Sequence, residues 1–98
     1  MIYVIATLRV QPEKLPQLLA AARIVIAATR KEDGCIFYDL HQSVTDPDQL
    51  VFVERWSSRE ALAKHFDAPH MVPWRAAGTQ AVVERKVEII APEHVETR

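Results

Sequence analysis

Three side chains that can hold or move a proton lie in the middle of the chain. Tyr38 falls in one apolar run, Glu54 near the end of the next, and His65 in the helical pattern that follows. A neutral imidazole can take a proton from a phenolic or enolic hydroxyl. A carboxylate can orient that imidazole or hold a substrate hydroxyl, and a phenol can donate to a developing oxyanion. We interpret His65 as a candidate base, Glu54 as its orienting carboxylate and Tyr38 as the oxyanion donor.

Each of these residues also has a purely structural interpretation. His65 could be a half-buried histidine bonded to backbone carbonyls, and Tyr38 a core tyrosine whose hydroxyl reaches water. A carboxylate among large apolar neighbours needs a partner or a proton. Glu54 could therefore be one half of a buried ion pair. The basic residues considered as its partner are Arg9, Arg85 and Lys86.

Several large apolar side chains could stack on a planar aromatic substrate, although core or interface packing is the common role of such residues. A histidine after Pro69, at the start of a short helical segment, could reach the same pocket. The predicted substrate-binding residues are Phe52, Trp56, Phe66, His70 and Trp74.

The sequence predicts neither a bound metal nor an organic cofactor. Glu54, His65 and His70 are a possible two-histidine, one-carboxylate set. However, the two histidines are five residues apart across Pro69 and do not share a helix face. No glycine-rich nucleotide-binding pattern occurs. Cys35 begins a strand without basic neighbours, so it is interpreted as a small core residue.

Alternating apolar residues predict four strands. The first is apolar at every even position, and Tyr3 and Ile5 make its other face partly apolar, so it should be covered on both sides. A short linker joins the second and third strands, which indicates an antiparallel hairpin. Tyr38 is expected to share its face with Ile36 and Leu40. The predicted strands are residues 2–10, 35–42, 49–56 and 82–91.

Helical periodicity and capping signals predict three helices. Pro12 marks the start of the first, and Gly34 is a candidate left-handed cap after it. Ser57 and Glu60 fit a capping box for the second helix. The third should have Pro73 in its first turn and Gly78 near its end. The predicted helices are about 13–31, 57–67 and 70–79.

The order βαββαβ predicts a ferredoxin-like α+β fold with a four-stranded antiparallel sheet. The helices should all pack on one face of this sheet, which leaves a partly apolar face bare. A twofold homodimer would cover it. Residues 1–98 are predicted to form one domain, with about 92–98 as a mobile tail.

Composition excludes several function classes. The 98 residues carry a formal net charge of −1 with acids and bases interspersed, so nothing favours nucleic acid or an anionic membrane as partner. No apolar run could span a bilayer, and the first ten residues lack signal-peptide features. One cysteine fits a reducing compartment, and we expect a cytoplasmic protein.

The segment Glu54-Arg55-Trp56, the helix start after it and His65, with Gly34 to Tyr38 upstream, resembles the antibiotic biosynthesis monooxygenase family. These are small dimeric α+β barrel proteins, among them quinol and anthrone oxidisers. The resemblance implies a monooxygenase without a cofactor, acting with dioxygen on a planar phenol or quinol. It also supports His65, because a histidine recurs there in the family.

Proteins with this fold have at least three other functions. Haem-degrading relatives carry an asparagine on the first strand. This chain has Ala6 and Thr7 there, which argues against haem cleavage. Other relatives isomerise or handle small phosphorylated sugars, and such an isomerase would need a cationic pocket. The third alternative is a non-catalytic dimeric ligand-binding or stress protein with a filled core.

Overall fold

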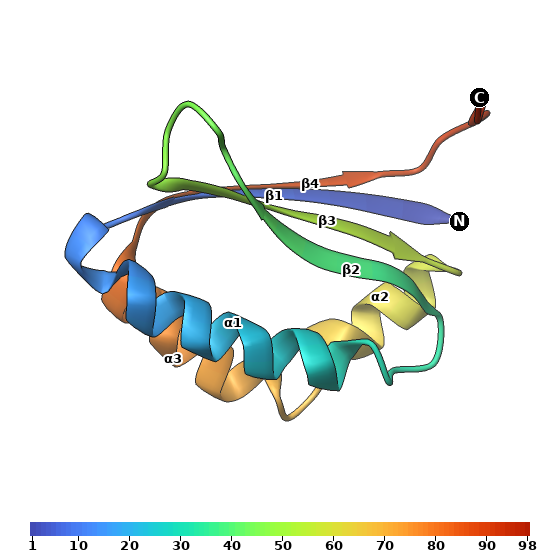
Figure 1. The fold of residues 1–98 in the computed structure, drawn as a ribbon. Coiled ribbons are helices and arrows are strands. Elements are labelled where there is room, and N and C mark those ends of the chain that lie inside the picture. The colour runs from blue at the N-terminus through green and yellow to red at the C-terminus, as the bar shows by residue number, and fades with distance from the viewer.

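The computed structural model describes all of residues 1–98 and contains four strands and three α-helices (Figure 1). A short 3-10 turn at Pro12–Lys14 precedes the first helix, and residues 91–98 contain no helix or strand. None of the helices combines the length and the apolar character that a membrane-spanning helix needs. The elements are β1 (Ile2–Val10), α1 (Leu15–Thr29), β2 (Cys35–Gln42), β3 (Gln49–Trp56), α2 (Arg59–Phe66), α3 (Met71–Ala81) and β4 (Val82–Ile90).

The four strands form one antiparallel sheet in the order β2-β3-β1-β4. All three helices lie on the same face of the sheet, and the opposite face is left without cover from this chain (Figure 1). The predicted ferredoxin-like arrangement and the predicted β2-β3 hairpin are confirmed. The layer between sheet and helices contains the cavity with a mainly hydrophobic lining.

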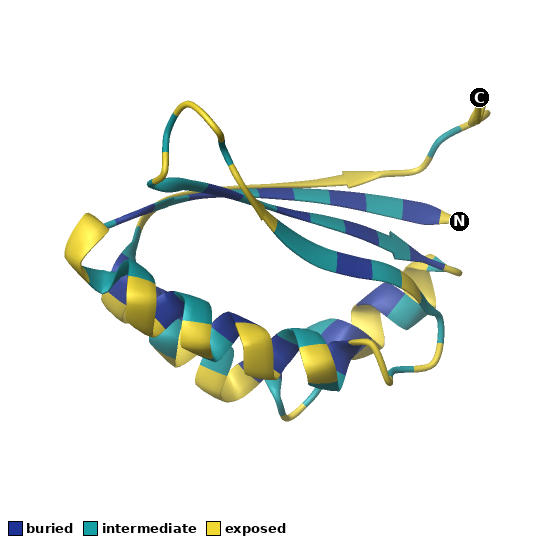
Figure 2. Ribbon diagram, in the orientation of Figure 1, coloured by how far each residue is buried: buried dark blue, intermediate teal, exposed yellow.

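β1 has the two-faced character that its sequence predicts. Its even residues are buried against the helices, and its odd residues are partly exposed on the open face (Figure 2). The alternation arises because successive side chains of a strand point to opposite faces. On the open face the Arg55 guanidinium stacks over Tyr3 and Phe37, at 5.6 and 5.5 Å from the ring centroids.

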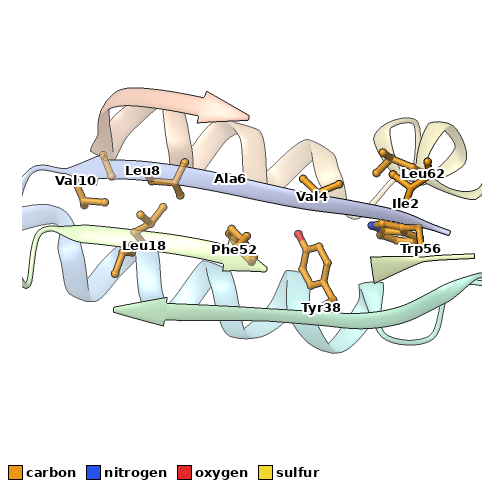
Figure 3. Packing of buried hydrophobic residues seen from close by; sticks show 12 residues of the cluster. Ile2, Val4, Ala6, Leu8, Val10, Leu18, Tyr38, Phe52, Trp56 and Leu62 are labelled. Atoms are coloured by element: carbon orange, nitrogen blue, oxygen red, sulfur yellow. The ribbon is translucent and has the colours of Figure 1, made fainter. Parts of the chain in front are cut away.

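The core lies between the central strands and the helices (Figure 3). Leu18 of α1, Leu50 and Trp56 of β3 and Leu62 of α2 have no exposed surface. Full burial of such side chains contributes roughly 1.5–3 kcal/mol each. Trp56 is the largest of them, and it lies where β3 meets α2.

The first helix is shorter than predicted. It begins at Leu15 after the 3-10 turn and ends at Thr29, so the predicted range 13–31 was too long at both ends. Pro16 explains the late start, because proline is tolerated only in the first turn, where backbone N–H groups have no helical partner. The residues after Thr29 form a turn that carries Glu32.

The second helix is capped one residue later than predicted. Ser58, in extended conformation, accepts a hydrogen bond from the Ala61 backbone N–H at 3.1 Å. The proposed Ser57–Glu60 capping box is therefore wrong, because Glu60 occupies the second and not the third helical position. Ser57 instead lies against Gly34.

The third helix is longer than predicted and runs to Ala81, directly before β4. Gly78 lies inside this helix and does not end it. A Cβ at Gly78 would lie 3.1 Å from the Arg85 Nη2 atom, so the bare glycine makes room for a side chain of β4.

A bulge near the start of β2 shows that one prediction is wrong, namely that Ile36 lies on the same face of the strand as Tyr38. Pairing with β3 shifts between Cys35, which lies opposite Trp56, and Phe37, which lies opposite Arg55. The extra residue, Ile36, is 52% exposed and does not share the buried face of Tyr38. A bulge adds one unpaired residue and so reverses the alternation before it. Cys35 is thereby turned toward the core, where it packs against buried residues.

Gly34 lies between α1 and β2 and is in contact with the start of α2. It does not cap α1 as predicted, because that helix ends at Thr29 with Arg30 as its C-cap. It has a φ of +85°, a value that favours glycine. A Cβ there would lie 2.6 Å from the Ala61 Cβ and 2.7 Å from the Ser57 Oγ. The Gly34 carbonyl also accepts a hydrogen bond from the Ser57 N–H at 2.8 Å. The two segments are thus in backbone contact.

Candidate active site

A cavity of about 160 Å³ lies between the sheet and the helices α2 and α3. In another protein, an engineered apolar cavity of about 150 Å³ binds benzene, so this space suits one aromatic ring. Nine of its thirteen lining residues are hydrophobic, which favours an apolar ligand. The lining consists of Val4, Ala6, Leu8, Tyr38, Phe52, Glu54, His65, Phe66, Met71, Trp74, Arg75, Arg85 and Val87.

His65 lines this cavity from the last turn of α2. Its side chain shares the buried face of that helix with Leu62 and is 1% exposed as a residue. The Nδ1 atom lies 2.8 Å from the Glu32 Oε2 atom. If Nδ1 carries the proton and donates it to this carboxylate, the lone pair of the neutral ring is on Nε2. Nε2 is then the nitrogen available to a ligand.

Glu32 comes from the turn between α1 and β2, and its side chain is 14% exposed. Its Oε2 atom also lies 2.7 Å from the His70 Nε2 atom, and Thr29 Oγ1 lies 3.3 Å from the same nitrogen. Two imidazole rings therefore meet one carboxylate oxygen. Such a partner fixes the tautomer and the orientation of a histidine. Glu32, not Glu54, is the carboxylate that contacts His65.

Glu54 lies on the buried face of β3, directly opposite Tyr38 of β2. Its Oε1 atom accepts a hydrogen bond from the Trp56 indole N–H at 2.9 Å. This contact replaces the ion pair considered from the sequence. Burial raises the pKa of Glu54 to about 7, which the indole hydrogen bond only partly offsets. At neutral pH this group can either give or accept a proton.

Burial also changes the pKa of the other two groups. It lowers the pKa of His65 from 6.5, and this effect exceeds the opposing influence of Glu32. Burial, followed by the charge of Glu54, raises the pKa of the Tyr38 phenol. At neutral pH the site therefore offers a neutral imidazole and a protonated phenol. One can accept a proton and the other can donate a hydrogen bond.

The predicted site residues fall into two groups. Tyr38, Glu54 and His65 line the cavity, as do Phe52, Phe66 and Trp74. Trp56 and His70 do not. Trp56 is fully buried beside Glu54, with its ring centroid 4.7 Å from that of His65, and His70 contacts Glu32.

The sequence alone does not identify Glu32 or Arg75, and it indicates Arg85 only as a possible ion-pair partner of Glu54. Glu32 is 33 residues from His65, in a charged segment that reads as an exposed turn. Its position two residues before Gly34 was the available signal, because a glycine between a helix and a strand indicates a turn. Arg75 lines the cavity from α3 and Arg85 from β4.

Glu32, His65 and His70 also have the chemistry of a metal site. One ligand atom of each lies within 4.8 Å of the others, a two-histidine, one-carboxylate set. The separations of 2.7 and 2.8 Å between nitrogen and oxygen are those of N–H···O hydrogen bonds. The three groups satisfy each other in this way without an ion.

The chain is similar to known proteins over most of its length. Residues 1–77 match the family described as antibiotic biosynthesis monooxygenase. "Putative monooxygenase Rv0793" of Mycobacterium tuberculosis is 39% identical over 90 residues, which cover 91% of this chain and 88% of the relative. Its solved structure superposes with a TM-score of 0.90, covering 98% of each chain.

A second relative is named for a substrate class. "Probable quinol monooxygenase YgiN" of Escherichia coli is 29% identical over 102 aligned positions, which cover 94% of this chain and 98% of the relative. A solved structure described as "Putative antibiotic biosynthesis monooxygenase from Nitrosomonas europaea" has a TM-score of 0.90 at 26% identity, and the match covers 96% of this chain and 100% of that one. With a match over more than three quarters of its length, this chain belongs to the antibiotic biosynthesis monooxygenase family.

Proposed function

We propose that this protein is a monooxygenase that needs no bound cofactor and oxidises a small planar phenol or hydroquinone. The observation that carries the proposal is the Glu32–His65 pair at the wall of an apolar cavity sized for one ring. A neutral, oriented imidazole beside an apolar binding surface is what proton removal from a phenol requires. The family and the names of its relatives support the same reaction class.

The substrate itself would supply the electrons. The His65 Nε2 atom takes the phenol proton, and the resulting anion passes one electron to dioxygen. The two radicals combine at a ring carbon, and the hydroperoxide formed there loses water to leave a carbonyl. One oxygen atom enters the ring and the other leaves as water, and all four electrons come from the hydroquinone. The protein supplies the base, the orientation and a cavity that excludes water.

The remaining residues have supporting roles in this proposal. The Tyr38 hydroxyl donates to the developing oxyanion, and Glu54 holds the second hydroxyl of the ring. The rings of Phe52 and Trp74 meet edge to face, with 5.5 Å between their centroids. Both line the cavity and would pack on the substrate. Outside the cavity, Trp56 would position Glu54, and His70 would position Glu32.

The reaction should require oxygen and no reductant. We expect 2-methylhydroquinone to be converted under air without NADH, and dialysis against EDTA to leave the rate unchanged. With ¹⁸O₂, mass spectrometry of the hydroxyquinone product should show one labelled atom from gas. The rate is corrected for autoxidation measured without protein. Equal enzymatic rates under argon and air would point to an isomerase, and no excess over autoxidation across a panel of quinols would point to a binding protein.

We further propose a homodimer formed through the open face of the sheet. Partly buried residues of β1 and the stacked Arg55 lie there without cover from this chain. The interface should bury more than about 1,200 Å² in total. Sedimentation at micromolar concentration should give twice the chain mass. Ile5→Glu, on the open face, should give monomers, whereas Ile24→Glu, on the exposed side of α1, should not. A single-chain mass for the unmodified protein would contradict the proposal.

A further inference from the structure

Arg85 places a positive charge on the helix-facing side of the sheet. It lies opposite Leu8 of β1, and paired residues of neighbouring strands share a face. The other charged residues of β4, Glu84, Lys86 and Glu88, alternate to the open face. No carboxylate lies within 4.0 Å of the Arg85 guanidinium. A cation at the edge of an apolar cavity, without an acidic partner in the chain, is free to bind an anion.

The packing of α3 accommodates this guanidinium. Its Nη2 atom lies 3.1 Å from the position of a Cβ at Gly78, so any larger residue at that point of α3 would press on it. Arg75, one turn earlier in the same helix, also lines the cavity. Its Nη2 atom donates to the Phe66 carbonyl at the end of α2. Both arginines are exposed, so they lie on the open side of the cavity.

The proton-handling groups lie toward the other end of the cavity. Glu54 lies opposite Val4 of β1, whereas Arg85 lies opposite Leu8. Four residues of strand separate the two levels, which is about 14 Å between backbone positions. The side chains of Glu54 and Arg85 both line the cavity between these two levels. Phe52, which pairs with Ala6, lines the cavity between them. The cavity therefore has acid–base groups toward one end, an apolar middle and cations toward the other.

We propose that the substrate is a single-ring hydroquinone that carries a carboxylate, and that Arg85 binds this carboxylate. This inference rests on the proposed function, which supplies the reaction that the bound ring undergoes. A guanidinium can bind a carboxylate through two parallel N–H···O bonds, which fixes orientation as well as affinity. The anchored ring would then direct a hydroxyl toward His65. A neutral quinol would bind less tightly and in more than one orientation.

Ligand binding measured under argon, where no oxygenation can occur, tests this inference separately from turnover. Isothermal titration calorimetry compares 2,5-dihydroxybenzoate with 2,5-dihydroxybenzamide, which has nearly the same shape and no charge. We expect the unmodified protein to bind the carboxylate about tenfold more tightly, a difference of about 1.4 kcal/mol. Arg85→Gln should abolish this preference and leave amide binding unchanged, and Arg85→Lys should keep part of it. Arg23→Gln, an exposed arginine of α1, is the matched control and should change neither affinity.

Several results would overturn the inference: equal affinities for the two compounds, a preference that survives Arg85→Gln, or no binding of either compound at millimolar concentration. Far-ultraviolet circular dichroism confirms that each variant is folded. Failure of the proposed function has a different signature, in which the carboxylate binds in an Arg85-dependent way under argon but yields no product under air.

Discussion

Replacing His65 by alanine is expected to lower kcat by about 100- to 10,000-fold while the protein stays folded. The loss is that of a general base in the step that makes the substrate anion. KM should change far less, because the aromatic wall and the cations of the cavity remain. Steady-state kinetics under air with a confirmed quinol substrate measure both constants. Full activity of His65→Ala would refute the assigned role.

Two further variants separate the base from its surroundings. His94→Ala lies in the C-terminal segment and should change nothing. Glu32→Gln removes the charge that orients His65 and stabilises its protonated form, so kcat should fall by about 100-fold or more. Unaltered turnover in Glu32→Gln would show that the pair has only a structural role.

The pH profile should identify the base. Neutral imidazole is the active form, so kcat/KM should rise with pH through the pKa of His65 and then level off. Burial lowers that pKa, so the rising limb should lie below pH 6.5. Glu54→Gln should keep this limb, because it belongs to His65. If the limb disappears in Glu54→Gln, the base is Glu54.

Replacing Trp56 by alanine is expected to lower the free energy of unfolding by about 3–5 kcal/mol. The indole is fully buried at the junction of β3 and α2, and its N–H satisfies the buried Glu54 carboxylate. For a domain of about 100 residues this corresponds to a fall in Tm of more than about 10 °C. Urea unfolding monitored by circular dichroism measures the loss.

Trp56→Phe separates packing from hydrogen bonding at the same position. It keeps most of the aromatic volume but leaves the Glu54 oxygen without its donor, which costs roughly 1–3 kcal/mol. The pKa of Glu54 should rise further, because the indole hydrogen bond is what lowers it. Val44→Ala, a fully exposed position, is the control and should change stability by less than about 0.5 kcal/mol. A loss below 1 kcal/mol for Trp56→Ala would show that Trp56 does not organise the core.

Periodic features of the fold could be predicted from the sequence. The alternation of β1, the hairpin of β2 and β3 and the single helical layer each follow from apolar spacing and linker length. These signals repeat over many residues, so one irregular position does not hide them. Single-residue shifts were not predictable in the same way. Ile36 adds a bulge, and Ser58 rather than Ser57 caps α2, because the final choice depends on tertiary contacts.

The candidate site shows the same division. Tyr38, Glu54 and His65 stand on regular elements, and their faces could be inferred from period and neighbours. Glu32 stands on a turn, whose path no periodicity describes, and it reaches His65 across 33 residues. The strand pattern predicts Glu54 as the partner of His65, but the Glu54 carboxylate instead accepts a hydrogen bond from the Trp56 indole.

The backbone contact at Gly34 has a consequence for how the protein responds to heat. It is the point where the turn bearing Glu32 meets the start of the helix bearing His65, and it leaves no room for a side chain. The contact lies at the end of the β2–β3 pairing, one residue beyond the Cys35–Trp56 pair, and the ends of elements can open at a lower free energy than the whole domain. Turnover would then be lost on warming while the circular dichroism of the sheet is still unchanged. The upper working temperature of the protein would be a property of one glycine contact and not of its melting point.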